Sequence, residues 1–238
     1  MLKEYIVRKF VLAGLTAVLF SPGLLFSGEV VHMKFDADLK DSAGGRSGRA
    51  IGTPVSYTAD RFGNPDSAVL LKKGDRISLG NDKGLSFVKD GKAQPFTVEW
   101  LQCYDAGGAG KQVILIQKND EYRIAWNNAF RFRADDRAKS ASLSRNNGKV
   151  SLKRGQWTHI AVVFENAGTD GIRFYQDGKQ IPAVADAGEK GKYQSMNPGK
   201  GPLMIGINFE GALDDLVIHD CALSAGEIRQ RAGKTAQP

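Results

Sequence analysis

The stretch Gly211–Ile228, GALDDLVIHDCALSAGEI, decides the fold because it joins a strand pattern directly to the start of a helix. From Leu213 to Asp220 the side chains follow the period of two that a β-strand requires. Ser224, followed three residues later by Glu227, is typical of a capping box, in which each side chain binds the other residue's backbone N–H at a helix start. The stretch therefore predicts a strand that ends a β-domain, followed by a short C-terminal helix.

Two adjacent carboxylates, Asp214 and Asp215, stand where the chain enters this strand. Neighbouring carboxylates repel each other unless they point to opposite faces or a cation neutralises them. A hard metal ion is therefore the first functional question that the stretch raises.

The rest of the 238-residue chain is rich in short strand patterns separated by Gly, Asn, Asp and Pro, and helix periodicity is almost absent. Short connections of this kind predict antiparallel strands in two stacked sheets. No linker divides the sequence, so we expect residues 29–238 to form a single all-β sandwich domain.

The N-terminus has the order of a secretory signal peptide. Basic residues precede an apolar run at Phe10–Phe20, and the small residues Ser27 and Gly28 follow. The alternative is an uncleaved anchor, but the run before Pro22 is shorter than the roughly 20 residues that a membrane span needs. We expect residues 1–28 to be removed, leaving no stable membrane span, and the protein to be secreted, periplasmic or on the cell surface.

The chain is basic, with a formal net charge of +7, and it stays basic without residues 1–28. Acidic glycans, envelope polymers and anionic membrane surfaces are suitable partners for such a charge. Nucleic acid is not expected, because the protein is predicted to be exported and no recognition helix or aromatic nucleic-acid motif is visible. A positive charge that serves only solubility is the alternative.

The segment Tyr122–Ala134 predicts a hairpin with two different faces. A three-residue loop at Asn127–Ala129 keeps the large apolar side chains on one side, whereas a two-residue turn mixes the faces. With that loop, three arginines share the solvent face, where like charges across a strand pair are unfavourable without an anion or an acidic neighbour. They are Arg123, Arg131 and Arg133. We interpret them as a ligand-binding cluster, and the alternative is a solvated face paired with the nearby Asp135 and Asp136.

Catalytic patterns are not found. The sequence lacks the E-x-D-x-x-E spacing that jelly-roll glucanases use, and Glu99 is the isolated carboxylate of its strand. The three histidines are scattered, and no nucleophile with an adjacent base is visible. The sequence therefore predicts a protein that is not an enzyme.

Several segments carry a family resemblance. Trp157–Phe164 (WTHIAVVF), Phe174–Lys179 (FYQDGK) and the C-terminal stretch, preceded in order by His32–Asp36 and Phe96–Trp100, resemble the laminin G-like jelly roll of the concanavalin A-like lectin/glucanase superfamily. A looser similarity connects them with pentraxins. The resemblance implies an all-β, two-sheet antiparallel jelly-roll sandwich.

The resemblance also implies a structural calcium ion. In related jelly rolls an aspartate at the start of the last strand holds the ion, and Asp214 occupies the matching position. Asp36 is a further oxygen donor, suggested by its nearness to the N-terminal strand. The alternative is that Asp214 accepts backbone N–H bonds without a metal.

The two cysteines, Cys103 and Cys221, are enough for one disulfide in an oxidising compartment. In related jelly rolls the strands that carry them lie close together, which favours a bridge, and two separate thiols are the alternative.

Function follows from the fold and from the missing catalytic groups. We expect an exported, non-catalytic binding module that recognises a carbohydrate or another cell-envelope ligand, with acidic ligands among the candidates. A structural or assembly protein acting through protein–protein contacts is the first alternative, and a divergent glycoside hydrolase is the second.

Overall fold

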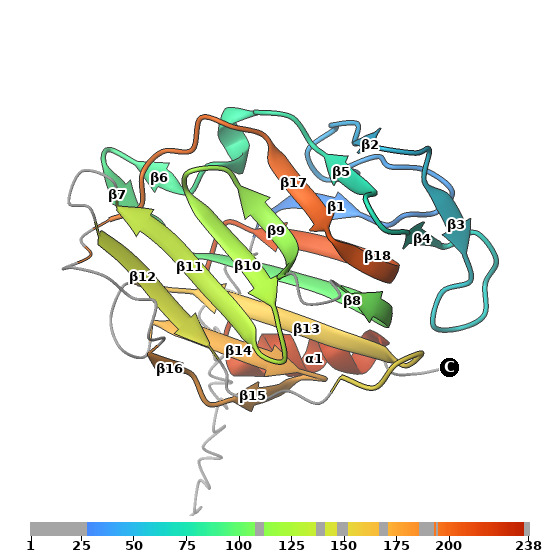
Figure 1. Ribbon diagram of the computed structural model, residues 1–238. Helices are drawn as coiled ribbons and strands as arrows, with labels where there is room; N and C mark the ends of the chain where they lie inside the picture. Colours follow the sequence, from blue (N-terminus) through green and yellow to red (C-terminus); the bar gives the residue numbers. More distant parts are fainter. Residues whose placement is uncertain are drawn as a thin grey trace, which may run out of the picture.

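The computed structural model describes residues 28–107, 112–136, 141–146, 152–166, 171–185, 193 and 195–235. Within them, two antiparallel sheets lie face to face, and one helix, α1 (Ala225–Thr235), covers the outer side of one sheet (Figure 1). The expected all-β jelly-roll sandwich with a short C-terminal helix is confirmed. No helix of the described residues is both long and apolar enough to cross a bilayer.

The first sheet has the strand order β15-β14-β13-β8-β18-β4-β3, and β1 also pairs with β18. Its strands are β1 (Glu29–Met33), β3 (Ser56–Thr58), β4 (Ala68–Leu71), β8 (Phe96–Gly107), β13 (Trp157–Phe164), β14 (Ile172–Gln176), β15 (Lys179–Ile181) and β18 (Phe209–His219). The long strands β8 and β18 form the centre of this sheet, and β18 lies between β8 and β1.

The second sheet has the order β16-β12-β11-β10-β9-β17-β5-β2. Its strands are β2 (Arg49–Ile51), β5 (Arg76–Ser78), β9 (Val113–Lys118), β10 (Tyr122–Trp126), β11 (Phe130–Asp136), β12 (Ala141–Asn146), β16 (Val184–Ala185) and β17 (Leu203–Ile207). A 3-10 turn, η1 (Lys83–Leu85), and a small hairpin of β6 (Val88–Lys89) and β7 (Lys92–Ala93) connect the two sheets.

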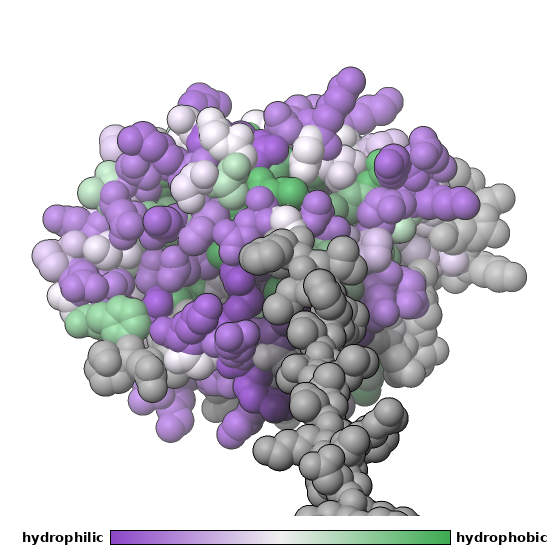
Figure 2. Space-filling view, turned by 180° about the vertical axis from the view of Figure 1, so that it is seen from behind, coloured by the Kyte–Doolittle hydropathy of each residue, from purple (hydrophilic) through white to green (hydrophobic). Residues whose placement is uncertain are grey.

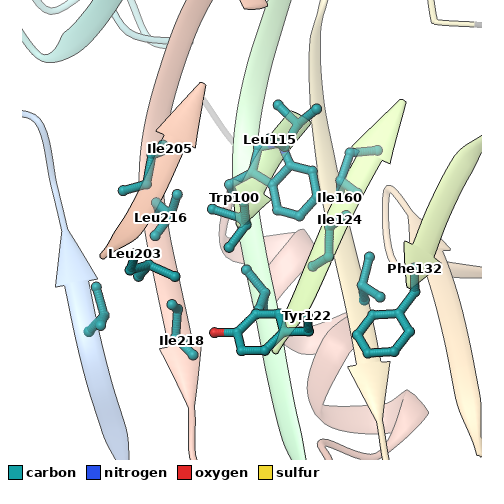
Figure 3. Packing of buried hydrophobic residues seen from close by; sticks show 14 of the residues in the cluster. Trp100, Leu115, Tyr122, Ile124, Phe132, Ile160, Leu203, Ile205, Leu216 and Ile218 are labelled. Carbon is teal, nitrogen blue, oxygen red and sulfur yellow. The ribbon is translucent and has the colours of Figure 1, made fainter. Parts of the chain in front are cut away.

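The core lies between the sheets, where both contribute fully buried apolar side chains (Figure 3). Trp100 and Ile218 of the first sheet face Ile124 and Leu203 of the second. Because alternate residues of each strand point inward, the intervening residues of both sheets point outward. The two outward faces are therefore the surfaces on which functional side chains can gather.

Helix α1 packs against the outward face of the first sheet through a second, smaller apolar cluster. Leu223 and Ile228 meet Ala161, Val163 and Tyr175 there. The capping box is confirmed, because Ser224 N donates to Glu227 Oε2 at 2.8 Å and Glu227 N donates to Ser224 Oγ at 3.3 Å. The sequence signal thus fixes where the helix begins, and the apolar cluster holds it on the sheet.

A tight turn at Asp177–Gly178 connects β14 to β15 beneath this helix. Both turn residues have positive φ, at 49° and 73°, which glycine adopts without strain. A Cβ on Gly178 would lie 3.1 Å from the Cβ of Ala232 in α1. Glycine therefore serves both the turn and the close approach of the helix.

Candidate functional site

The hairpin β10–β11 has the register that the three-residue loop predicts. Trp126 lies across from Phe130, Ile124 from Phe132 and Arg123 from Arg133. Ile124, Phe130 and Phe132 are completely buried in the core, whereas Trp126 is half-buried at its edge, with its ring 4.8 Å from that of Tyr104. The prediction of the hairpin register is confirmed.

Arg123, Arg131 and Arg133 form what we call the arginine face, on the outward side of the second sheet. All three are half-buried rather than fully exposed, because neighbouring strands pack against their stems. Arg133 Nε donates to Asp135 Oδ1 at 2.9 Å. The expected clustering is present, and Asp135 supplies one of the local ion pairs that the sequence suggested.

Arg123 carries an unsatisfied donor on this face. Its Nε is shielded from solvent and has no hydrogen-bond partner. Burial, together with the positive charge of Arg133, lowers the pKa of Arg123. A guanidinium in this position favours an approaching anion, because an unsatisfied buried donor and a nearby like charge are both unfavourable.

The arginine face belongs to a longer outward row that runs across seven of the eight strands of the second sheet, from β2 to β12. Register connects residues of seven neighbouring strands: Arg49, Ser78, Met204, Gln117, Arg123, Arg133 and Ser144. With strands about 4.8 Å apart, six such steps span roughly 29 Å. Six of the seven residues are polar, and all of these except the buried Ser144 offer hydrogen-bonding groups along a line rather than at a point.

The outward face of the first sheet holds a polar cluster that the sequence did not reveal. Glu99 on β8 lies between His159 of β13 and His219 of β18, with distances of 3.1 Å from Glu99 Oε2 to His159 Nε2 and 2.9 Å from Glu99 Oε1 to His219 Nε2. Arg231 of α1 pairs with the same carboxylate. Although burial opposes ionisation, the hydrogen bonds from both histidines hold the pKa of Glu99 well below its usual range.

The Glu99 cluster was missed because its other members lie 60 to 132 residues from Glu99 in the chain. Only the strand order β13-β8-β18 brings the three strand residues together. The signal in the sequence was a polar residue at an otherwise apolar position in each of three strands. That signal does not specify which strands are neighbours.

The expected calcium ligand Asp214 lies beside a cation supplied by the protein itself. Arg61 donates from NH1 to Asp214 Oδ2 at 3.1 Å and from NH2 to Asp215 Oδ2 at 3.3 Å. Asp215 also forms a hydrogen bond with His32, in which His32 Nε2 lies 3.3 Å from Asp215 Oδ1. The Arg61 guanidinium thus takes the place that a metal ion would need between the two carboxylates.

The other expected ligand, Asp36, lies apart from this pair, in a polar depression with Asp38 and Asp41. Among the residues that the structure describes, no group of three or more His, Cys, Asp or Glu side chains is placed to hold a metal ion. Calcium needs six to eight oxygen ligands, and a buried guanidinium is not one of them. In this arrangement a calcium ion at Asp214 would have to displace Arg61.

The expected disulfide between Cys103 and Cys221 is not formed. Their strands do pair, as the sequence suggested, but Cys103 lies across from Ala212. The carbonyl of Cys221 instead accepts a hydrogen bond from Thr97, six residues from Cys103 along β8. Six strand residues span roughly 20 Å, and a disulfide requires Cα atoms within about 7 Å, so register places the two sulfurs at opposite ends of the strand pair.

Comparison with known proteins agrees with this architecture. Residues 73–229 match the model of the family Laminin_G_3, described as the concanavalin A-like lectin/glucanases superfamily, and the chain belongs to that family. The resemblance inferred from the sequence is thereby confirmed. No curated protein sequence matches the chain.

Three solved structures illustrate the similarity in fold. Domain 4 of AbnA, an extracellular GH43 arabinanase from Geobacillus stearothermophilus solved with arabinotriose, is 17% identical with a TM-score of 0.63, over 87% of this chain and 98% of that one. The binding domain of Paraclostridial Mosquitocidal Protein 1 is 16% identical with a TM-score of 0.64, over 87% of this chain and 52% of that one.

The third is a structure of botulinum neurotoxin type C, whose cell entry depends on two ganglioside molecules. It is 12% identical with a TM-score of 0.63, over 88% of this chain and 52% of that one. The chain thus spans about half the length of the two toxin chains. At these identities the similarity concerns the fold alone.

Proposed function

We propose that the protein is an exported, non-catalytic binding module that recognises an acidic glycan through the arginine face, defined by Arg123, Arg131 and Arg133. The observation that carries the proposal is the direct pairing of Arg123 with Arg133 on adjacent strands. Like charges in this position are stabilised when an anion lies between or above them. Export is supported by the signal-peptide pattern of residues 1–28.

The extended polar row that contains the arginine face supports a chain-like ligand. A row that spans roughly 29 Å, at about 4.8 Å per strand, suits several sugar units in succession better than one small molecule. Arabinotriose, named for one protein of similar fold, is a glycan, and the gangliosides named for another carry a glycan head group, which makes a glycan a reasonable ligand class for this fold. The basic character of the chain favours an acidic one.

The arrangement of the buried carboxylates supports a non-catalytic role. Glycoside hydrolysis needs one carboxylic acid and one carboxylate that flank a sugar. Glu99 is occupied by two histidines and Arg231, and Arg61 holds both Asp214 and Asp215. None of these three carboxylates lies on the arginine face, which belongs to the other sheet.

Affinity electrophoresis in gels containing polygalacturonate tests the proposal, with neutral dextran as the reference polymer. We expect retardation by polygalacturonate that weakens as salt rises, because exposed charges are screened within about 8 to 10 Å near physiological ionic strength. Replacing Arg123, Arg131 and Arg133 together with Gln is expected to reduce retardation at least tenfold. Arg154→Gln is the matched control, since Arg154 is exposed and pairs with Asp105 elsewhere on the surface.

Two results would overturn the proposal. Equal retardation of the triple variant and the original protein would leave the arginine face as a solvated surface. Equal retardation by dextran and polygalacturonate would show that charge does not select the ligand. Melting curves of the triple variant show whether a loss of retardation is due to unfolding.

A further inference from the structure

A cavity of about 260 Å³ lies on the outward face of the first sheet, beside the end of α1 and on the opposite side of the sandwich from the arginine face. Its lining residues come from β1, β8, β13, β18, α1 and the segment that carries Arg61. Seen from behind (Figure 2), most of the described surface on this side is hydrophilic. Seven of the nine residues that line the cavity are polar or charged, and the cavity is separate from the proposed glycan face.

The cavity also has apolar lining residues. Leu101 and Val217 line it, and both side chains are almost completely buried although neither belongs to the core between the sheets nor to the cluster beneath α1. The apolar part of this lining offers a surface for the C–H face of a small ring.

The acidic groups of the cavity are already neutralised. Glu99 accepts from His159, His219 and Arg231, and Asp215 accepts from Arg61 and His32. Carboxylates that are each bound to two or more donors have little capacity left for a cationic ligand.

Some nitrogen atoms of the basic residues, by contrast, have no hydrogen-bond or ion-pair partner. Lys234 lines the cavity, is exposed, and makes no ion pair with any residue that the structure describes. The His159 side chain is 5% exposed, with Nε2 directed to Glu99, and its Nδ1 is shielded from solvent without a hydrogen-bond partner. Arg61 Nε is likewise buried without a partner. Unpartnered buried polar atoms are rare in native proteins, and here two residues of one cavity carry them.

We propose that this cavity binds a single sugar residue that carries a carboxylate, with its ring over Leu101 and Val217 and its carboxylate toward Arg61 and Lys234. The volume lies just below the roughly 300 to 1,000 Å³ of sites for drug-sized ligands, which suits one ring rather than a chain.

The position of Phe62 agrees with this ligand. Its side chain is 42% exposed, although it is a large apolar group, and the Arg61 guanidinium lies over its ring at 4.3 Å from the centroid. The loop is held by Asp60, which accepts from the backbone N–H groups of Phe62 and Asn64. Phe62 does not itself line the cavity, but its exposed ring lies against Arg61, which does, and offers a flat surface to a sugar ring that extends past Arg61.

Titration with sodium D-glucuronate tests the proposal, with D-glucose as the neutral probe of the same ring size. In protein labelled with 15N-histidine, glucuronate is expected to shift the His159 ring resonances, and glucose at the same concentration is not. Lys234→Gln is expected to weaken glucuronate binding about three- to tenfold. Lys89→Gln, at an exposed lysine that does not line the cavity, is expected to leave it unchanged.

Three results would overturn the proposal: equal binding of glucose and glucuronate, glucuronate binding that leaves the His159 resonances unmoved, or undiminished binding by Lys234→Gln. The triple Gln variant of the arginine face separates this site from the proposed function. If that variant keeps its glucuronate affinity, the cavity is an independent site. If it loses that affinity, the sugar binds to the arginine face and the cavity proposal is wrong.

Discussion

Glu99 and His219 face each other across the central strands of the helix-covered sheet, with His219 Nε2 2.9 Å from Glu99 Oε1. Both side chains are almost completely buried, and Arg231 reaches the same carboxylate from α1. A single carboxylate thus connects two strands of one sheet to the C-terminal helix. The stability of the helix on the sheet depends on that charge.

Glu99→Gln is expected to destabilise the protein by about 3 to 5 kcal/mol, because it removes the charge of a buried carboxylate that accepts hydrogen bonds from two buried histidines and from the half-buried Arg231. Urea unfolding at neutral pH measures the change. Glu165→Gln is the matched control: Glu165 pairs with Arg173 but is half-exposed, so its loss is expected to cost less than about 1 kcal/mol. A similar cost for both variants would contradict the bridging role of Glu99.

Ser224→Ala tests the capping box at the start of α1. The substitution removes the side-chain acceptor of Glu227 N–H and is expected to cost about 1 kcal/mol. Urea unfolding again measures the change. Ser224→Asp, which keeps an acceptor at the N-cap, is expected to restore most of the stability. Equal loss in the two variants would show that the cap does not hold the helix.

The features of the fold that the sequence predicts are those governed by local pattern. The register of the hairpin β10–β11 follows from side-chain alternation and loop length, so the pairing of Arg123 with Arg133 is predictable from these residues alone. The capping box at Ser224 and Glu227 is local in the same sense. The family resemblance is also reflected in the sequence, because five short segments occur in the order of the family.

The features that the sequence does not predict depend on register between distant strands. Arg61 contacts Asp214 although the two residues are 153 positions apart in the chain. No pattern in either segment predicts this pairing. The disulfide prediction failed on the same point, because β8 and β18 are neighbours but are aligned so that Cys103 and Cys221 lie far apart. Adjacency of strands is therefore not enough to predict a contact between their side chains.

The family resemblance predicts a calcium ion at Asp214, whereas the position of Arg61 argues against one, and melting curves decide between the two. Because Arg61 already contacts both Asp214 and Asp215, we expect equal melting temperatures with calcium and with a chelator. A ligand that binds only the folded state raises its stability by mass action, so a bound ion would separate the two curves. A calcium-dependent rise that disappears in Asp214→Asn would show that the ion displaces Arg61.

Asp214 is also expected to make stability depend on pH. Burial and the neighbouring charge of Asp215 raise the pKa of Asp214 to about 7, from an ordinary value of 3.8. Between these two values the folded protein binds more protons than the unfolded chain. The free energy of unfolding is therefore highest below about pH 4 with respect to this group, and it falls as pH rises toward 7.

Asp214→Asn removes this titration while keeping a side chain of the same shape. We expect the free energy of unfolding to fall less in the variant than in the original protein between pH 5 and pH 8, by on the order of 2 to 4 kcal/mol. His32, whose pKa is raised by its hydrogen bond to Asp215, adds a fall of the same sign that both proteins share. Urea unfolding at several pH values gives the two slopes, and parallel slopes would mean that Asp214 is already ionised beside Arg61 in the folded protein.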